Sequence, residues 1–250
     1  GLGLAGLIEQ IMLQISPALV VNFTAAHAKG DRQSLEASYR RVIRTVALIM
    51  LPISMGGAII MPELLPLIFG DAFEPAVPAA ATLLAFVWLA GMSVIPWGII
   101  SASGRSATLL RVQITSAAAT IVLLSILVPS FGLEGAALAR AAIVTLTFVL
   151  LGWMAWKYVR VALPVTALAK TVLAATLCAG AASLGVYILD GLPALLSAIP
   201  AGAITYMLAI RFLRLITPED AQILMATAGG KLPRASRPFV GRLLDFLAPG

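Results

Sequence analysis

Arg140 is the residue in this sequence whose type and position point most directly to chemistry. It lies just over one helical turn inside an apolar run that begins near Ala136. A cation within a membrane span costs about 2.5–3.5 kcal/mol at the helix centre and less near the interface, so such residues usually face an internal cavity. The guanidinium offers a planar fork of donors that matches phosphate oxygens. Two interpretations stay open: Arg140 contacts an anionic ligand, or it pairs with Glu134 or reaches the outer surface.

Glu9 is the second candidate for chemistry. It lies in the first apolar segment, close to Gln10 and Gln14. A buried carboxylate can take up and release a proton when its surroundings change, because burial and nearby charges alter its protonation equilibrium. Glu9 is therefore a candidate for proton coupling, and the alternative is that it lies at the outer membrane interface.

Other site chemistries lack the residues they need. The chain has one histidine, His27, and one cysteine, Cys178. These residues cannot form a histidine-based metal site, a cysteine cluster or a disulfide within this chain. No Gly-Lys-Ser/Thr phosphate loop and no His-Glu-x-x-His motif is present, and the acidic pair Glu219-Asp220 suits a helix start better than a metal site. We expect no metal, no cofactor and no enzymatic activity.

The composition indicates which elements must position Arg140 and Glu9. Hydrophobic residues make up 60% of the chain and charged residues 11%, and the mean hydropathy is +1.01. A soluble domain is roughly half apolar and a quarter charged, so lipid is the expected solvent. Backbone groups in lipid must be satisfied internally, which favours helices. The net charge of +6 does not indicate nucleic acid, because the basic residues form short clusters between apolar segments.

The sequence predicts an all-α, polytopic transmembrane helix bundle of about seven spans. Crossing the hydrocarbon takes roughly 20 apolar residues in a helix. The segments that satisfy this length are 1–26, 45–69, 76–102, 112–130, 136–156, 165–189 and 193–212.

The connections between these spans alternate in charge. Those on one side hold only acidic residues, namely Asp71, Glu74, Glu134 and Asp190. Every basic residue except Arg140 and Lys170 falls on the other side, and Lys170 lies close enough to a span end to snorkel. The positive-inside rule makes the basic side cytoplasmic. We expect a multi-pass protein of the bacterial inner membrane with a cytoplasmic C-terminal tail.

The order of several short motifs resembles the C-terminal half of the polysaccharide flippases, which belong to the multidrug/oligosaccharidyl-lipid/polysaccharide exporter superfamily. The resemblance covers roughly residues 10 to 160. The motifs are the Leu51-Pro52 pair, Leu67-Ile68-Phe69-Gly70 followed by Phe73 and Ala76, the Ser103-Gly104-Arg105 turn, and Phe131-Gly132-Leu133-Glu134-Gly135-Ala136-Ala137-Leu138-Ala139.

The resemblance implies a domain organisation. These transporters have two six-helix lobes, often with two extra C-terminal helices. Residues 1–160 would then form helices of the second lobe, 161–214 two additional transmembrane helices, and 215–250 a cytoplasmic tail. The chain would be a fragment, and its partners would include the missing N-terminal lobe and membrane lipids.

The resemblance also implies a function, the translocation of lipid-linked oligosaccharide for polysaccharide export. Arg140 would then bind the phosphate of the lipid-linked sugar. A multidrug or lipid II exporter of the same superfamily is one alternative. A membrane-embedded polysaccharide polymerase or ligase is another, although polymerases tend to have a large outer loop and the outer connections here are short. A membrane scaffold without transport would lack an intramembrane charge such as Arg140.

The predicted topology can be tested by cysteine labelling from the periplasmic side. Cysteines introduced at Asp71 and Asp190 should react with a membrane-impermeant reagent, because both positions lie in predicted outer connections. A cysteine at Arg105 should stay unlabelled until the membrane is permeabilised. The reverse labelling pattern would contradict the orientation.

Overall fold

The computed structural model describes residues 32–189 and 191–215, and over these residues the chain is helical without strands. The first predicted span and most of the predicted tail lie outside the described residues. The elements are α2 (Arg32–Phe69), the 3-10 helix η1 (Asp71–Ala76), α3 (Val77–Ala102), α4 (Ser106–Met154), the π-helical turn η2 (Ala155–Val159), α5 (Val165–Ile188) and α6 (Gly191–Phe212).

The predicted class, a bundle of membrane-spanning helices, is confirmed for the described residues. Five helices are long and apolar enough to cross a membrane. The longest, α4, reverses direction at Gly132, where φ is 55° and ψ is −127°. The predicted spans 112–130 and 136–156 are therefore the two arms of this one element, which we call the first and second arm of α4. Each other predicted span within the described residues also coincides with a helix.

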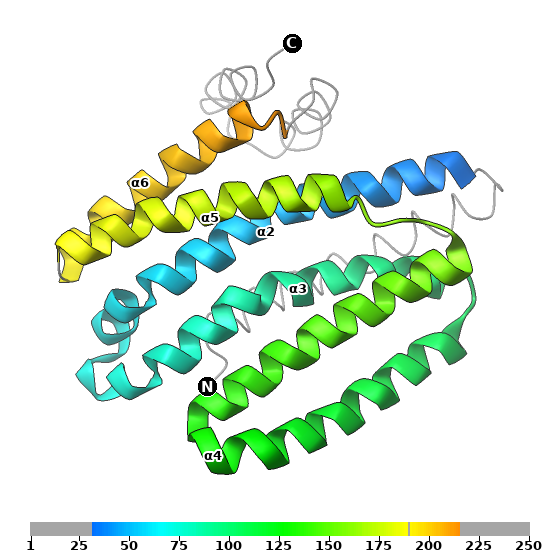
Figure 1. Cartoon of the computed structure of the whole chain (residues 1–250), viewed down its shortest axis with the longest axis horizontal. Helices are drawn as coiled ribbons and strands as arrows, with labels where there is room; N and C mark the ends of the chain where they lie inside the picture. The colour runs from blue at the N-terminus through cyan, green and yellow to red at the C-terminus, as the bar shows by residue number, and fades with distance from the viewer. Residues whose placement is uncertain (1–31, 190, 216–250) are drawn as a thin grey trace.

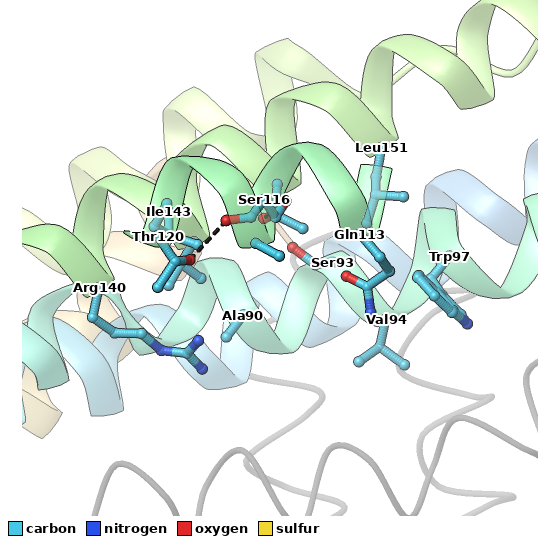
Figure 2. Close-up of a pocket in the computed structure, with 13 residues that line it drawn as sticks. Ala90, Ser93, Val94, Trp97, Gln113, Ser116, Thr120, Arg140, Ile143 and Leu151 are labelled. Carbon is cyan, nitrogen blue, oxygen red and sulfur yellow. Dashed lines mark hydrogen bonds between the residues drawn. The ribbon is translucent and has the colours of Figure 1, made fainter. Parts of the chain in front are cut away.

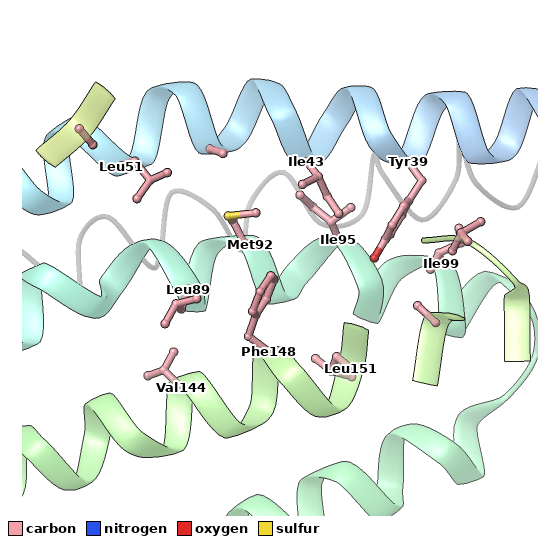
Figure 3. Close-up of a cluster of buried hydrophobic side chains, with 14 of the residues drawn as sticks. Tyr39, Ile43, Leu51, Leu89, Met92, Ile95, Ile99, Val144, Phe148 and Leu151 are labelled. Atoms are coloured by element: carbon pink, nitrogen blue, oxygen red, sulfur yellow. The ribbon is translucent and has the colours of Figure 1, made fainter. Parts of the chain in front are cut away.

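The helices lie side by side in the spatial order α4, α3, α2 and then the α5–α6 pair (Figure 1). Helix α4 packs on α3, α3 packs on α2, and α2 contacts both α5 and α6, which also pack on each other. Ile43 of α2, Ile95 of α3 and Phe148 of α4 belong to one buried cluster that joins these layers (Figure 3). Helix α2 is thus the central element, with α3 and α4 on one side and α5 and α6 on the other.

Connections of opposite charge lie at opposite ends of the bundle (Figure 1). The 3-10 helix η1, the reversal of α4 and the α5–α6 connection lie at one end. The α3–α4 turn, the α4–α5 connection and the start of α2 lie at the other, where Glu36 and Arg40 form an ion pair of 2.7 Å. This separation agrees with the charge alternation in the sequence.

Pro52 interrupts the hydrogen bonding of α2, and a side chain from α6 compensates for it. Proline has no N–H, so the carbonyl of Leu48 one turn earlier loses its helical donor. The hydroxyl of Tyr206 donates to that carbonyl at 2.7 Å. Because lipid offers no replacement donor, the contact satisfies a group that would otherwise be costly to bury. Tyr206 therefore fixes α6 against α2 at the proline.

A second polar contact ties α6 to α2 near the acidic end. The backbone N–H of Gly191, at the first residue of α6, donates to Oε2 of Glu63 at 2.6 Å. A carboxylate is favourable there because the N-terminus of a helix has unpaired N–H groups and a positive dipole end. Leu48 and Glu63 are separated by about 22 Å along the helix, given a rise of about 1.5 Å per residue. The two contacts thus hold α6 at well-separated levels of α2.

The role of Tyr206 predicts a specific coupling with Pro52. Tyr206→Phe should lower the free energy of unfolding by about 1 kcal/mol, because the Leu48 carbonyl loses its donor. In a Pro52→Ala background the new backbone N–H can donate to Leu48, so the same change should cost much less. Unfolding titrations of the four proteins in detergent measure this double-mutant cycle. Equal costs in both backgrounds would contradict the assignment.

Candidate functional site

A polar cavity lies between α3 and the two arms of α4 (Figure 2). Its volume is about 700 Å³, within the range of small-molecule sites. The described lining residues come from three helical segments. They are Ala90, Ser93, Val94 and Trp97 of α3, Gln113, Ser116, Ala117 and Thr120 of the first arm, and Arg140, Ile143, Val144, Thr147 and Leu151 of the second arm.

Two glycines at the reversal of α4 bring the arms together. Gly132 adopts a positive φ of 55°, a conformation that side chains with a Cβ rarely take. At Gly135 an added Cβ would collide with the backbone carbonyl of Leu127. The second arm therefore starts in direct backbone contact with the first. This contact sets the spacing at which Ser116 and Thr147 meet further along the arms.

The hydroxyl groups of the cavity are hydrogen-bonded in a way that leaves acceptors available. Ser116 Oγ and Thr147 Oγ1 lie 2.9 Å apart and join the two arms. Thr120 donates to the Ser116 carbonyl at 2.7 Å, and Ser93 donates to the Leu89 carbonyl at 2.7 Å. A hydroxyl has one donor and two acceptor lone pairs, so those of Ser93 and Thr120 retain lone pairs for a ligand. Such a lining suits a ligand rich in donors.

Gln113 and Trp97 lie together at the end of the cavity away from Arg140 (Figure 2). The Gln113 amide provides both donors and an acceptor, and the Trp97 indole provides an apolar face and one N–H. A ligand that reaches from Arg140 to this end would meet a cation first, then hydroxyls, then an amide and an aromatic ring.

Arg140 provides the charge of the cavity. It is the ionisable side chain among the described lining residues. It also borders a smaller cavity of about 40 Å³, whose other walls include Leu83, Phe86 and Val87 of α3. Arg140 thus borders both cavities while its side chain remains exposed.

The structure brings together some of the predicted site residues and not others. The expectation that Arg140 faces a cavity agrees with its position, whereas its contact with a substrate stays a prediction. Glu134 is exposed at the reversal of α4, six residues before Arg140. Side chains at that helical spacing do not face each other as i,i+3 or i,i+4 pairs do. Glu9, the proton-coupling candidate, lies outside the described residues.

Sequence reasoning did not select the polar residues of the first arm. Gln113, Ser116 and Thr120 recur at spacings of three and four, so they fall on one helical face. A polar stripe on an otherwise apolar span was the signal that could have found them. On the second arm, Arg140, Val144 and Thr147 recur at spacings of four and three. Arg140 and Thr147 therefore also fall on one helical face.

Comparison with known proteins supports one broad class. Residues 6–78 match a family described as polysaccharide biosynthesis protein, and within the described residues this segment includes α2 and η1. No curated protein and no solved structure matches the chain. Together with the membrane-spanning helices, the match supports a multi-pass membrane protein with a role in polysaccharide synthesis or export.

The geometry of the α4 reversal predicts a crosslinking result. In a Cys178→Ala background, Ser116→Cys and Thr147→Cys should form a disulfide on mild oxidation, because the native hydroxyl oxygens are 2.9 Å apart. Adding Gly135→Val should sharply reduce its yield, since a Cβ there collides with the Leu127 backbone. The measurement is the disulfide yield on non-reducing gels.

The matched control is Gly180→Val in α5, where an added Cβ meets no atom within 4 Å. This control should leave the crosslink intact. An equal loss of crosslinking in both valine variants would show that Gly135 does not set the spacing of the arms.

Proposed function

We propose that this protein translocates lipid-linked oligosaccharide across the bacterial cytoplasmic membrane for polysaccharide export. The observation that supports this most directly is the cavity of about 700 Å³ in which Arg140 and several hydroxyls interrupt apolar helices. A guanidinium suits the phosphate of a lipid-linked sugar. Hydroxyl and amide acceptors suit the sugar's own hydroxyl groups. The matched family description favours a polysaccharide substrate over a drug.

Alternating access is the mechanism that we propose for this translocation. In a two-lobed transporter, one helical lobe rocks against the other around a central site. The second arm of α4 and helix α3 would form one wall of that site, and an N-terminal lobe would form the other. Glu9 would couple the movement to proton transfer, as the sequence suggests.

Two alternatives differ from this proposal in class. A multidrug or lipid II exporter would use a similar cavity for another cargo. A polysaccharide polymerase or ligase would be an enzyme with an extended outer loop. Within the described residues, Gly70 and η1 alone connect α2 to α3, and α4 reverses at Gly132 without a loop. These short connections favour transport over polymerisation.

Variants of Arg140 in the full-length protein test the proposal. Arg140→Ala should reduce export by at least tenfold while membrane insertion is unchanged, because the phosphate loses its cation. Arg140→Lys should restore part of the export, since the charge remains although the bidentate geometry is lost. Lys170→Ala is the matched control, because Lys170 is a cation in an apolar segment that does not line the cavity.

A double variant separates substrate binding from a structural role. If Arg140 only balances Glu134, then Arg140→Gln combined with Glu134→Gln should restore export, because no unpaired charge remains. If Arg140 binds the substrate, the double variant should stay inactive. Normal export by Arg140→Ala would remove Arg140 from the site.

A further inference from the structure

A cluster of cations and aromatic rings lies at the basic end of the bundle, apart from the cavity. The guanidinium carbon of Arg105 lies 4.8 Å from the centroid of the Tyr158 ring. The ammonium of Lys157 lies 5.4 Å from the same centroid and 4.9 Å from that of Trp153. Two cations thus share one aromatic ring, and we call Arg105, Trp153, Lys157 and Tyr158 the basic–aromatic cluster.

The backbone beneath this cluster is firmly held. Lys157 and Tyr158 lie in the π-helical turn η2. Ala155 at its start and Val161 just after its end are both fully buried. Arg160 between them adopts a left-handed conformation with φ of 62°, which turns the chain towards α5. Turns of π-helix are rare in proteins overall, but they occur often at functional sites. This local geometry therefore favours a functional surface over a fraying helix end.

The charges of the cluster are not neutralised by the described part of the chain. Within that part, the ion pair that the structure shows joins Glu36 to Arg40, and no carboxylate pairs with Arg105 or Lys157. Two like charges held at one ring repel each other, and an aromatic face offsets this by only about 0.5–1 kcal/mol for each at an exposed site. An anion that contacts both cations would relieve the repulsion.

The neighbouring side chains indicate where that anion comes from. Trp153, which contacts Lys157, is 49% exposed, and Trp156, the residue before Lys157 in the sequence, is 53% exposed. Tryptophan is enriched where hydrocarbon meets the headgroups, and arginine and lysine at that depth attract anionic lipids. The apolar arms of α4 adjoin the cluster, so acyl chains can lie beside it while the headgroup reaches the cations.

We infer that the basic–aromatic cluster binds the phosphate of an anionic membrane lipid in the leaflet at the basic end of the bundle. The rings would pack against the glycerol region, while Arg105 and Lys157 would donate to the phosphate oxygens. This site is separate from the cavity and does not depend on the proposed translocation. The sequence predicts that the leaflet is the cytoplasmic one.

Native mass spectrometry of the full chain, titrated with phosphatidylglycerol or phosphatidylcholine, tests this site. The first phosphatidylglycerol should bind roughly tenfold more tightly than the first phosphatidylcholine, given the attraction expected for two cations. Arg105→Gln combined with Lys157→Gln should remove that difference. The matched control, Arg41→Gln with Arg214→Gln, removes the same charge from exposed residues outside the cluster and should preserve it.

Two further measurements test the ring and the source of the phosphate. Tyr158→Phe should keep the preference because the ring remains, whereas Tyr158→Leu should reduce it several-fold. Millimolar inorganic phosphate should not displace the bound phosphatidylglycerol. Displacement would overturn the lipid assignment in favour of free phosphate. An equal loss in the control pair, or unchanged binding in the Arg105 and Lys157 pair, would overturn the site itself.

Discussion

A helix in hydrocarbon must satisfy every backbone carbonyl from within the protein, and α2 depends on this requirement at Pro52. Water can repair a missing helical hydrogen bond in a soluble protein, but no water is present in the bilayer core. The hydroxyl of Tyr206 replaces the missing donor at the carbonyl of Leu48. Helix α2 runs from Arg32 to Phe69 through three prolines, of which Pro52 is the one that Tyr206 compensates, and it provides the central surface on which the other layers pack. Helix α3, which lines the cavity, packs on this surface.

Much of this architecture could be predicted from the sequence, because the length of the apolar runs, the charge of the connections and the positions of the glycines are local features. Apolar runs give the helices, and the acidic and basic connections give their alternating direction. The glycines around Phe131 correctly mark the place where α4 reverses. These signals need no knowledge of neighbouring helices, so they can be interpreted from one sequence.

The packing order and the cavity could not be predicted in the same way. The spans are apolar on nearly all sides, so hydrophobic periodicity does not say which face contacts which neighbour. The hydrogen bond between Tyr206 and Leu48 joins residues 158 positions apart, so no local sequence pattern predicts it. Arg140 could be selected from the sequence because it is a charge in an apolar run. The hydroxyls of Ser116 and Thr147 could not, because they meet only when the two arms of α4 pack together. Arg140 lies within the described residues, so its predicted position at a cavity could be compared with the structure. Glu9 lies outside the described residues.

The cavity and the basic–aromatic cluster both present cations that could bind an anionic group, and they do so in different surroundings. Arg140 is exposed on the cavity between α3 and the two arms of α4, and it is the ionisable side chain among the described lining residues. Arg105 and Lys157 lie at an exposed end, where salt and water weaken each single attraction. Strength there comes from holding two cations in fixed positions on one ring. The cavity therefore offers one cation among hydroxyl and amide groups, whereas the cluster gathers two cations on one aromatic ring.

The contact between Tyr206 and Leu48 also has a consequence for how the protein is made. A ribosome that adds about 5–20 residues per second needs about 8–30 s to pass from Leu48 to Tyr206. During this interval α2 is already synthesised, but its orphaned carbonyl has no donor from α6. The hydrogen bond that satisfies this carbonyl therefore forms only after α6 has been made. A chain released before Tyr206 would therefore leave the Leu48 carbonyl without the donor that α6 supplies.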